Sequence, residues 1–145
     1  MYSAISLEGQ VEKQANGNLR LLADRHILLL SSTSYTPDED FMVLVEALDL
    51  VDKDSLVPRI QVIVTGKGPQ KAMFDTIFRQ RNSKWKKSNI RQVWLEIDDY
   101  PKVVGSCDLG ICLHNSSSGY DLPMKVVDMF SAGLPCLAIG GYPSV

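Results

Sequence analysis

Short apolar runs rich in β-branched residues alternate along this chain with amphipathic stretches, and this alternation limits the fold more than any other feature. The apolar runs, which we expect to be strands, cover residues 26–32, 59–65, 90–95, 108–113 and 135–139. A repeated strand–helix order is typical of a parallel sheet with helices on its faces. We therefore predict an α/β fold, a Rossmann-like parallel sheet with flanking helices.

Four helices are expected between these strands, and the first has the clearest pattern. Over residues 40–51 apolar side chains recur at helical spacing, and an aspartate at position 38 or 40 can cap the helix. The residues expected to face the core are Phe41, Leu44, Val45 and Leu48. The other helices are expected near 69–81, 100–106 and 123–132.

The pattern indicates one domain, residues 26–145, after a polar lead of residues 1–25. The last expected strand is followed by only a few residues, so we expect a C-terminally incomplete doubly wound domain. Fifteen Lys and Arg against 17 Asp and Glu leave a net charge of −2, which does not favour nucleic acid as a partner. No apolar run approaches the roughly 18 residues of a membrane span.

The cysteines and histidines do not form a metal-binding pattern. Cys107, Cys112 and Cys136 contain no CxxC pair, and only His26 and His114 could join them. We therefore predict no bound metal, and three unpaired cysteines fit a reducing compartment.

The loop of Gly66, Lys67 and Gly68 places one cation between two small residues at the start of a helix. Such a loop allows a phosphate or diphosphate to approach the backbone. It is neither a Walker motif nor GxGxxG, because Gly68 replaces the Ser or Thr after the lysine and Lys71 replaces the last glycine. The alternative is a solvent turn whose glycines serve only the backbone.

A second polar loop leads from the fourth strand into the last helix, and its groups can bind a sugar or a diphosphate. The loop candidates are His114, Ser116, Ser117, Ser118 and Gly119. Asp121, Lys125 and Asp128 follow at helical spacing on one face, where a carboxylate could hold ribose hydroxyls and the lysine could meet phosphate. The alternative is a solvated ion-pair stripe. A Ser-His-Asp hydrolase is disfavoured because the GxSxG motif is absent.

Basic residues also gather around Trp85, between positions 79 and 91. These residues are Arg79, Arg81, Lys84, Lys86, Lys87 and Arg91. Such a cluster could touch anionic lipid or a lipid-linked diphosphate, but a solvated loop is the favoured interpretation.

Five segments together resemble the chitobiosyldiphosphodolichol β-mannosyltransferase family, glycosyltransferase family 33. They are SSTSYTPDEDF (31–41), TGKGP (65–69), WLEIDDYP (94–101), GSCDLGICLHNSSS (105–118) and GYDLPMKVVDMF (119–130). Their order is colinear with the family from about residue 27 to residue 139. The resemblance implies the donor-binding domain of a GT-B glycosyltransferase, covering most of its C-terminal half.

The resemblance implies GDP-mannose as donor and a dolichol-linked chitobiose as acceptor, with inverting β-1,4-mannosyl transfer in N-glycan precursor assembly. It places the enzyme at the cytosolic face of the endoplasmic reticulum membrane, held there by a region absent from this chain. It implies no cofactor. The general base would lie outside this chain, so no catalytic residue is assigned. A truncated, non-catalytic paralogue without an acceptor domain is the alternative.

By the same resemblance, Asp128 would hold the ribose, and Ser32 and Thr33 would form the floor of the site. Residues 66–68 and 116–119 would surround the diphosphate and mannose. Lys67 and Lys125 would offset the charge of the leaving group. The wider superfamily often has two glutamates eight positions apart here, whereas this chain has Tyr120 eight residues before Asp128.

Overall fold

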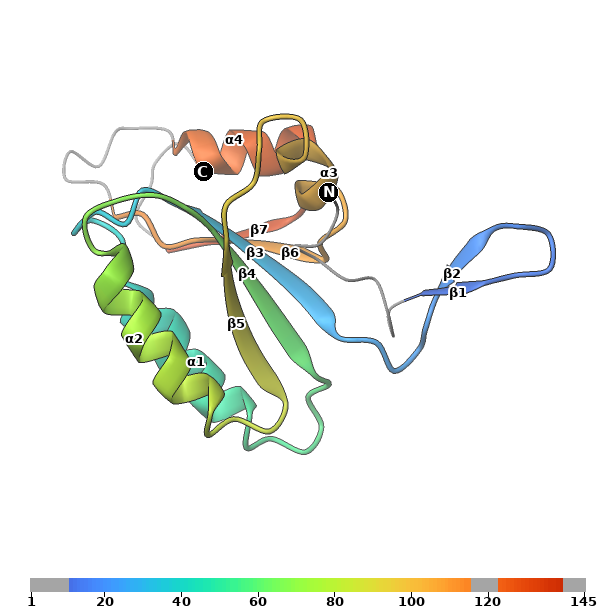
Figure 1. Cartoon of the computed structure of the whole chain (residues 1–145), viewed down its shortest axis with the longest axis horizontal. Coiled ribbons are helices and arrows are strands. Elements are labelled where there is room, and N and C mark those ends of the chain that lie inside the picture. The colour runs from blue at the N-terminus through green and yellow to red at the C-terminus, as the bar shows by residue number, and fades with distance from the viewer. Residues whose placement is uncertain (1–10, 116–122, 140–145) are drawn as a thin grey trace.

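The apolar runs form one parallel sheet in the computed structural model, which describes residues 11–115 and 123–139 (Figure 1). Its strands are β3 (Ile27–Thr33), β4 (Ile60–Gly66), β5 (Ser88–Val93), β6 (Leu109–Cys112) and β7 (Cys136–Ala138). They are ordered β5-β4-β3-β6-β7, and all neighbouring pairs are parallel. The predicted α/β fold is therefore confirmed.

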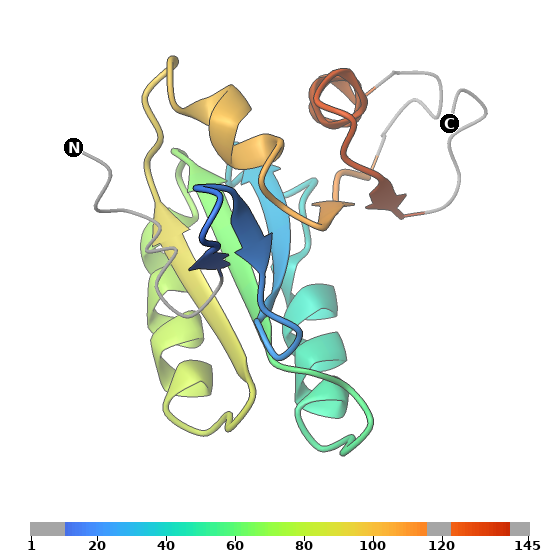
Figure 2. The same ribbon diagram turned by 90° about the vertical axis from the view of Figure 1, so that its right-hand side faces the viewer.

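Helices cover both faces of the sheet, as Figure 2 shows. The helices α1 (Phe41–Val51) and α2 (Lys71–Asn82) pack on one face, and α3 (Tyr100–Val104) and α4 (Met124–Ser131) lie on the other. Because side chains alternate along a strand, neighbouring residues of β3 face opposite helical layers. Leu29 packs in the α1–α2 core, whereas the fully buried Leu30 packs in the α3–α4 core.

The predicted elements of the domain are present, and their ends differ from the prediction by two residues or fewer. The inward face of α1 is confirmed, since all four expected residues are buried. Asp40 caps the helix by accepting a hydrogen bond from the Met42 N–H at 2.9 Å. Both ends of β5 lie two residues earlier than predicted, and the carboxylate of Asp52 accepts the backbone N–H of its first residue, Ser88.

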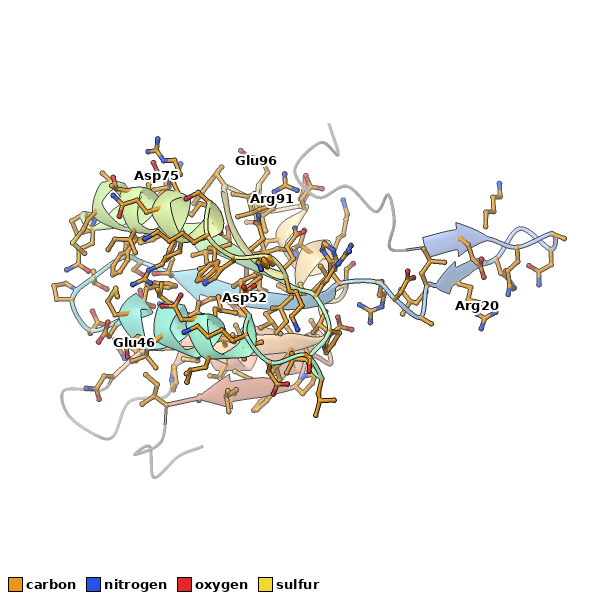
Figure 3. The ribbon with its side chains drawn as sticks, turned by 90° about the horizontal axis from the view of Figure 1, so that it is seen from below. Arg20, Glu46, Asp52, Asp75, Arg91 and Glu96 are labelled. Carbon is orange, nitrogen blue, oxygen red and sulfur yellow. The ribbon has the colours of Figure 1, made fainter. Side chains whose placement is uncertain are left out.

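Part of the lead forms a hairpin that the sequence pattern does not predict. The strands β1 (Val11–Lys13) and β2 (Leu19–Leu21) pair antiparallel around a turn at Gly17. Each strand has three residues, too few for a clear alternation of apolar and polar side chains. The hairpin projects from the sheet, with Arg20 labelled on it in Figure 3. The division into residues 1–25 and 26–145 stays a prediction.

The chain reverses its direction of winding at β3. From this central strand it proceeds outward to β4 and β5, and then returns to the other side for β6 and β7. In open parallel sheets, ligands bind outside the carboxyl ends of the strands at such a switch point. Here that point lies between the ends of β3 and β6.

Candidate functional site

Most of the predicted site residues lie at or near the carboxyl edge of the sheet. The structure describes eight of the thirteen, and these are Ser32, Thr33, Gly66, Lys67, Gly68, His114, Lys125 and Asp128. The other five lie outside the described residues, and these are Ser116, Ser117, Ser118, Gly119 and Asp121. The described eight come from the ends of three neighbouring strands and from α4.

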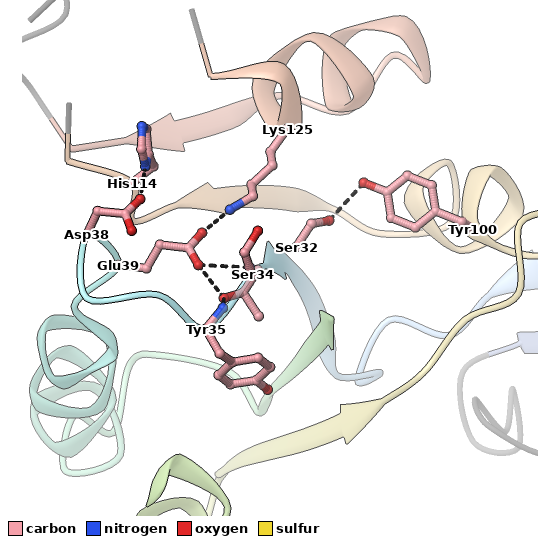
Figure 4. A network of polar contacts seen from close by, with 9 residues as sticks. Ser32, Ser34, Tyr35, Asp38, Glu39, Tyr100, His114 and Lys125 are labelled. Atoms are coloured by element: carbon pink, nitrogen blue, oxygen red, sulfur yellow. Dashed lines mark hydrogen bonds and ion pairs between the residues drawn. The ribbon is translucent and has the colours of Figure 1, made fainter. Parts of the chain in front are cut away.

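A buried carboxylate, Glu39, connects three parts of this edge (Figure 4). Glu39 is only 3% exposed. Its Oε2 accepts hydrogen bonds from the Thr33 hydroxyl at 2.5 Å and from the Ser34 N–H at 2.9 Å, and its Oε1 pairs with the Lys125 ammonium. A buried carboxylate is costly unless it is paired, and these donors satisfy it. Glu39 thus joins the end of β3 to the first turn of α4.

The chain turns sharply after β3 at Tyr35, a bulky residue in the left-handed backbone region. Its φ is 48°, yet its side chain is 1% exposed. The ring stacks on Phe41 at 5.6 Å between centroids, and the hydroxyl accepts a hydrogen bond from Gln92 at 2.7 Å. Burial raises the pKa of Tyr35 to about 12. Backbone strain of this kind persists only where surrounding contacts hold it, and it is common near functional sites.

The glycines of the β4–α2 loop lie against the loop that follows β3. A Cβ on Gly66 would lie 1.8 Å from the Thr33 carbonyl oxygen, and one on Gly68 would lie 1.6 Å from the Ser34 carbonyl oxygen. Gly66 also has a φ of 153°. Both glycines therefore allow close contact between the β4–α2 loop and the segment at the end of β3. This agrees with the alternative that the sequence left open, and the diphosphate role stays a prediction.

Lys67 contacts an aromatic ring in the structure. Its ammonium lies 3.7 Å from the centre of the Trp94 ring, and Trp94 is 51% exposed. Such a cation–π contact at an exposed site contributes about 0.5–1 kcal/mol. Lys67 thus lies beside the loop between β5 and α3, still at the carboxyl edge of the sheet.

His114 connects the end of β6 to the loop before α1 through a contact with Asp38. Its Nδ1 lies 2.5 Å from the carboxylate of Asp38, and the N–H of Asn115 donates to the Asp38 carbonyl oxygen at 2.8 Å. A hydrogen bond from Thr36 is the main cause that lowers the pKa of Asp38, with contributions from the bond to His114. Two loops on either side of the switch point are thereby held together.

A groove of about 350 Å³ opens between α3 and α4. Its lining residues are Tyr100, Pro101, Val104, Gly105, Asp128, Ser131 and Ala132. The Tyr100 and Ser32 hydroxyls are hydrogen-bonded at 2.8 Å, so Ser32, predicted to form the floor of the site, lies beside this groove. Burial raises the pKa of Tyr100 against the opposing effect of the Ser32 bond, and the charge of Asp128 raises it further. The volume lies within the range of small-ligand sites, about 300–1,000 Å³.

The chemistry of this edge suits an anionic ligand with hydroxyl groups. The first turn of α4 has no acidic residue and no side-chain cap, so its positive end and Lys125 act together. Asp128, on the same helix, faces the groove and can accept hydrogen bonds from hydroxyls. These groups together can hold a diphosphate and a ribose.

Two residues of this edge, Glu39 and Tyr100, are not indicated as site residues by the sequence pattern. Glu39 and Lys125 are 86 positions apart, so no local spacing indicates their contact. Tyr100 begins the short helix α3 and resembles an ordinary half-buried aromatic residue in the sequence. The only available signal for Glu39 was a charged residue next to the cap of a helix that follows the central strand.

Two of the basic residues around Trp85, Arg81 and Lys87, form hydrogen bonds within the chain. Arg81 and the Trp85 indole N–H both bind the carboxylate of Asp49, at 2.7 and 2.8 Å. Lys87 donates to the carbonyl oxygens of Asp54 and Val57. These contacts join α1 and the loop after it to α2 and the segment that follows, and the solvated loop favoured over a lipid contact stays a prediction.

The described part of the chain contains neither a metal-binding cluster nor a helix that could cross a membrane. No group of three or more His, Cys, Asp or Glu side chains there could hold a metal ion. Among the helices of residues 11–115 and 123–139, none combines the length and apolar content of a bilayer crossing.

Solved structures with a similar fold are glycosyltransferases of the GT-B type. The catalytic domain of cholesterol-α-glucosyltransferase from Helicobacter pylori gives a TM-score of 0.61 at 13% identity, covering 81% of this chain and 67% of that chain. S. aureus TarM also gives 0.61 at 13% identity, covering 79% of this chain and 21% of that chain. At this identity the likeness shows the fold alone.

Curated relatives are far closer in sequence, although no family model matches the chain. The chitobiosyldiphosphodolichol beta-mannosyltransferase of Yarrowia lipolytica is 50% identical over 79% of this chain and 24% of its own length. The Homo sapiens protein of that name is 44% identical over 86% and 27%. The UDP-glycosyltransferase TURAN of Arabidopsis thaliana is 42% identical over 86% and 30%. The chain therefore belongs to the sequence family of the chitobiosyldiphosphodolichol beta-mannosyltransferases and spans about a quarter of their length.

Proposed function

We propose that this chain is the donor-binding part of a GDP-mannose-dependent β-mannosyltransferase whose acceptor is a dolichol-diphosphate chitobiose. The similarity to relatives named for this acceptor, 44–50% identical over most of the chain, carries the proposal. In the transfer, the acceptor hydroxyl oxygen forms a bond to the anomeric carbon of mannose while the bond from that carbon to the β-phosphate oxygen breaks. The electron pair leaves with GDP, a general base takes the acceptor proton, and the configuration inverts.

The geometry of the carboxyl edge supports a nucleoside diphosphate as the ligand. Asp128 faces the groove beside α3 and would accept hydrogen bonds from the two ribose hydroxyls. Lys125 and the amino end of α4 would meet the diphosphate, where negative charge grows as GDP departs. Lys67, at the end of β4, is a second cation on this edge.

Calorimetric titration of the chain with GDP, GDP-mannose, UDP and NAD tests the donor. UDP is the important competitor, because one relative is named a UDP-glycosyltransferase. We expect GDP and GDP-mannose to bind more tightly than UDP and NAD. We expect Asp128→Ala to weaken GDP binding by about tenfold or more, since hydrogen bonds to a charged group contribute about 1.5–3 kcal/mol.

Glu46→Ala is the control, because Glu46 is exposed on α1 (Figure 3), and α1 covers the sheet face opposite to the helices that line the groove. It should bind GDP as the wild-type chain does. Equal affinity for all four ligands would refute the donor assignment. Mannosyl transfer by this chain to a dolichol-diphosphate chitobiose would exclude a purely non-catalytic role.

We further propose that the protein acts at the cytosolic face of the endoplasmic reticulum membrane. A dolichol-linked acceptor, as the relatives' names specify, is a membrane lipid, which supports this location. Co-fractionation of the protein with endoplasmic reticulum membranes, and its digestion by protease added outside sealed vesicles, would test it. Protection from that protease would contradict the proposal.

A further inference from the structure

We infer that Glu39 is a positioning residue that holds the Lys125 ammonium in place for the diphosphate of the donor. The inference rests on the proposed function and adds a residue that the sequence does not indicate. Lys125 lies in the first turn of α4, whereas Glu39 lies just before α1, on the far side of the switch point. Their ion pair therefore bridges the place where the ligand is expected (Figure 4).

The position of Lys125 is electrostatically unfavourable without a nearby carboxylate. The amino end of a helix carries partial positive charge, so a cation in the first turn is destabilising. The first turn of α4 contains no acidic residue that could compensate. Glu39 supplies the missing negative charge from another part of the chain, and its side chain is only 2% exposed against 24% for Lys125.

The carboxylate of Glu39 is itself held in place by neighbouring donors. Its Oε2 accepts hydrogen bonds from the Thr33 hydroxyl and the Ser34 N–H. Thr33 Oγ1 in turn accepts the Tyr35 N–H at 2.8 Å, so the carboxylate is fixed by the strained turn after β3. A lysine held by a fixed carboxylate has already lost much of its rotamer freedom before the ligand arrives. Glu39 thus raises the affinity for a diphosphate through Lys125.

A double-mutant cycle on ligand affinity tests this. Glu39→Gln, Lys125→Met and the double variant are titrated with GDP and, separately, with inorganic pyrophosphate. We expect Glu39→Gln to lower the affinity for both ligands about three- to tenfold, and Lys125→Met to lower it about tenfold. The double variant should match Lys125→Met alone, because Glu39 then has no lysine to position. Lys125→Arg, which keeps the cation, should retain most of the affinity.

The control for a purely structural effect is Asp108→Asn, at the opposite edge of the sheet. Asp108 also pairs with a cation, Arg25, and accepts a backbone N–H, that of Leu28. It should lower thermal stability without changing the affinity for either ligand. Equal weakening by Asp108→Asn and Glu39→Gln would overturn the inference, because affinity would then follow stability.

The outcomes separate this inference from the proposed function. If the losses of affinity in Glu39→Gln and Lys125→Met were additive, or if Glu39→Gln bound the ligands more tightly, the positioning role would be overturned. Selective binding of GDP would still support the proposed function in that case. If the two substitutions had coupled effects on pyrophosphate affinity but the chain bound GDP no more tightly than UDP, the positioning role would be supported. The assignment of GDP-mannose as the donor would then be contradicted. A wild-type chain that binds neither GDP nor pyrophosphate would overturn both.

Discussion

Carboxylates hold the two edges of the sheet together in different ways. At the amino edge, the carboxylate of Asp108 accepts hydrogen bonds from two guanidinium nitrogens of Arg25, at 2.5 and 2.7 Å. The carboxylate of Asp52 accepts hydrogen bonds from the backbone N–H groups of Lys86, Lys87 and Ser88. At the carboxyl edge, the carboxylate of Glu39 holds a lysine of α4.

The difference concerns what each carboxylate holds in place. The partners at the amino edge are mainly backbone groups and a guanidinium, and their contacts fix where β3, β5 and β6 begin. At the carboxyl edge Glu39 also accepts a backbone N–H, that of Ser34, but it pairs in addition with the side chain of Lys125, on a helix that lines a groove. The same chemical group therefore stabilises the fold at one edge and, in the role that we propose for Glu39, positions a lysine for a ligand at the other.

The largest effect is expected where the two loops of the carboxyl edge touch. In Gly68→Ala the new Cβ would lie 1.6 Å from the Ser34 carbonyl oxygen, so the backbone must move. We expect a loss of about 3 kcal/mol or more in the free energy of unfolding. Urea denaturation measures it.

Gly133→Ala is the comparison variant. Gly133 has a φ of 72°, but an added Cβ would meet no atom within 4 Å. It should lose only about 1–2 kcal/mol, the cost of the left-handed conformation. If Gly68→Ala were no less stable than Gly133→Ala, the close contact between the loops would be wrong.

A smaller effect, confined to stability, is expected at the amino edge. The hydrogen bond from Arg25 lowers the pKa of Asp108, so the ionised carboxylate stabilises the folded chain above its ordinary pKa of about 3.9. Asp108→Asn should cost about 1–3 kcal/mol near pH 7. The difference from wild type should shrink as the pH falls below about 4, because the unfolded wild-type chain then binds a proton at Asp108 that the folded chain takes up only at lower pH.

Denaturation of both proteins at a series of pH values from 7 to about 3 measures this dependence. A stability difference that stays constant over that range would show that the charge of Asp108 contributes nothing. A loss of GDP affinity in Asp108→Asn would contradict the separation between the two edges.

The smallest effect on stability is expected for Lys67→Met. Its cation–π contact with the half-exposed Trp94 is worth about 0.5–1 kcal/mol, so the unfolding midpoint should change little. If Lys67 also meets the donor diphosphate, GDP affinity should fall about threefold or more while guanosine affinity stays the same. Unchanged GDP affinity would limit the role of Lys67 to its contact with Trp94.

Much of the fold could be predicted from local patterns. The inward face of α1, its cap at Asp40 and the five strands follow from side-chain periodicity and turn residues within short windows. The hairpin could not, since pairing of two three-residue strands depends on the backbone more than on side-chain pattern. The close contact that Gly66 and Gly68 allow between two loops could not be predicted from the sequence either. The carbonyl oxygens that oppose them belong to β3 and the segment after it, which are distant in sequence.

The sequence by itself determined an α/β sheet and the family, whereas the edge where a ligand binds stays a prediction. Periodicity and motifs are properties of neighbouring residues, so they can be recognised in one dimension. Only the tertiary structure decided that Glu39 meets Lys125 across 86 positions and that Asp38 meets His114 across 76. These contacts depend on β6 lying beside β3 and on α4 covering the opposite face from α1, which local patterns do not specify.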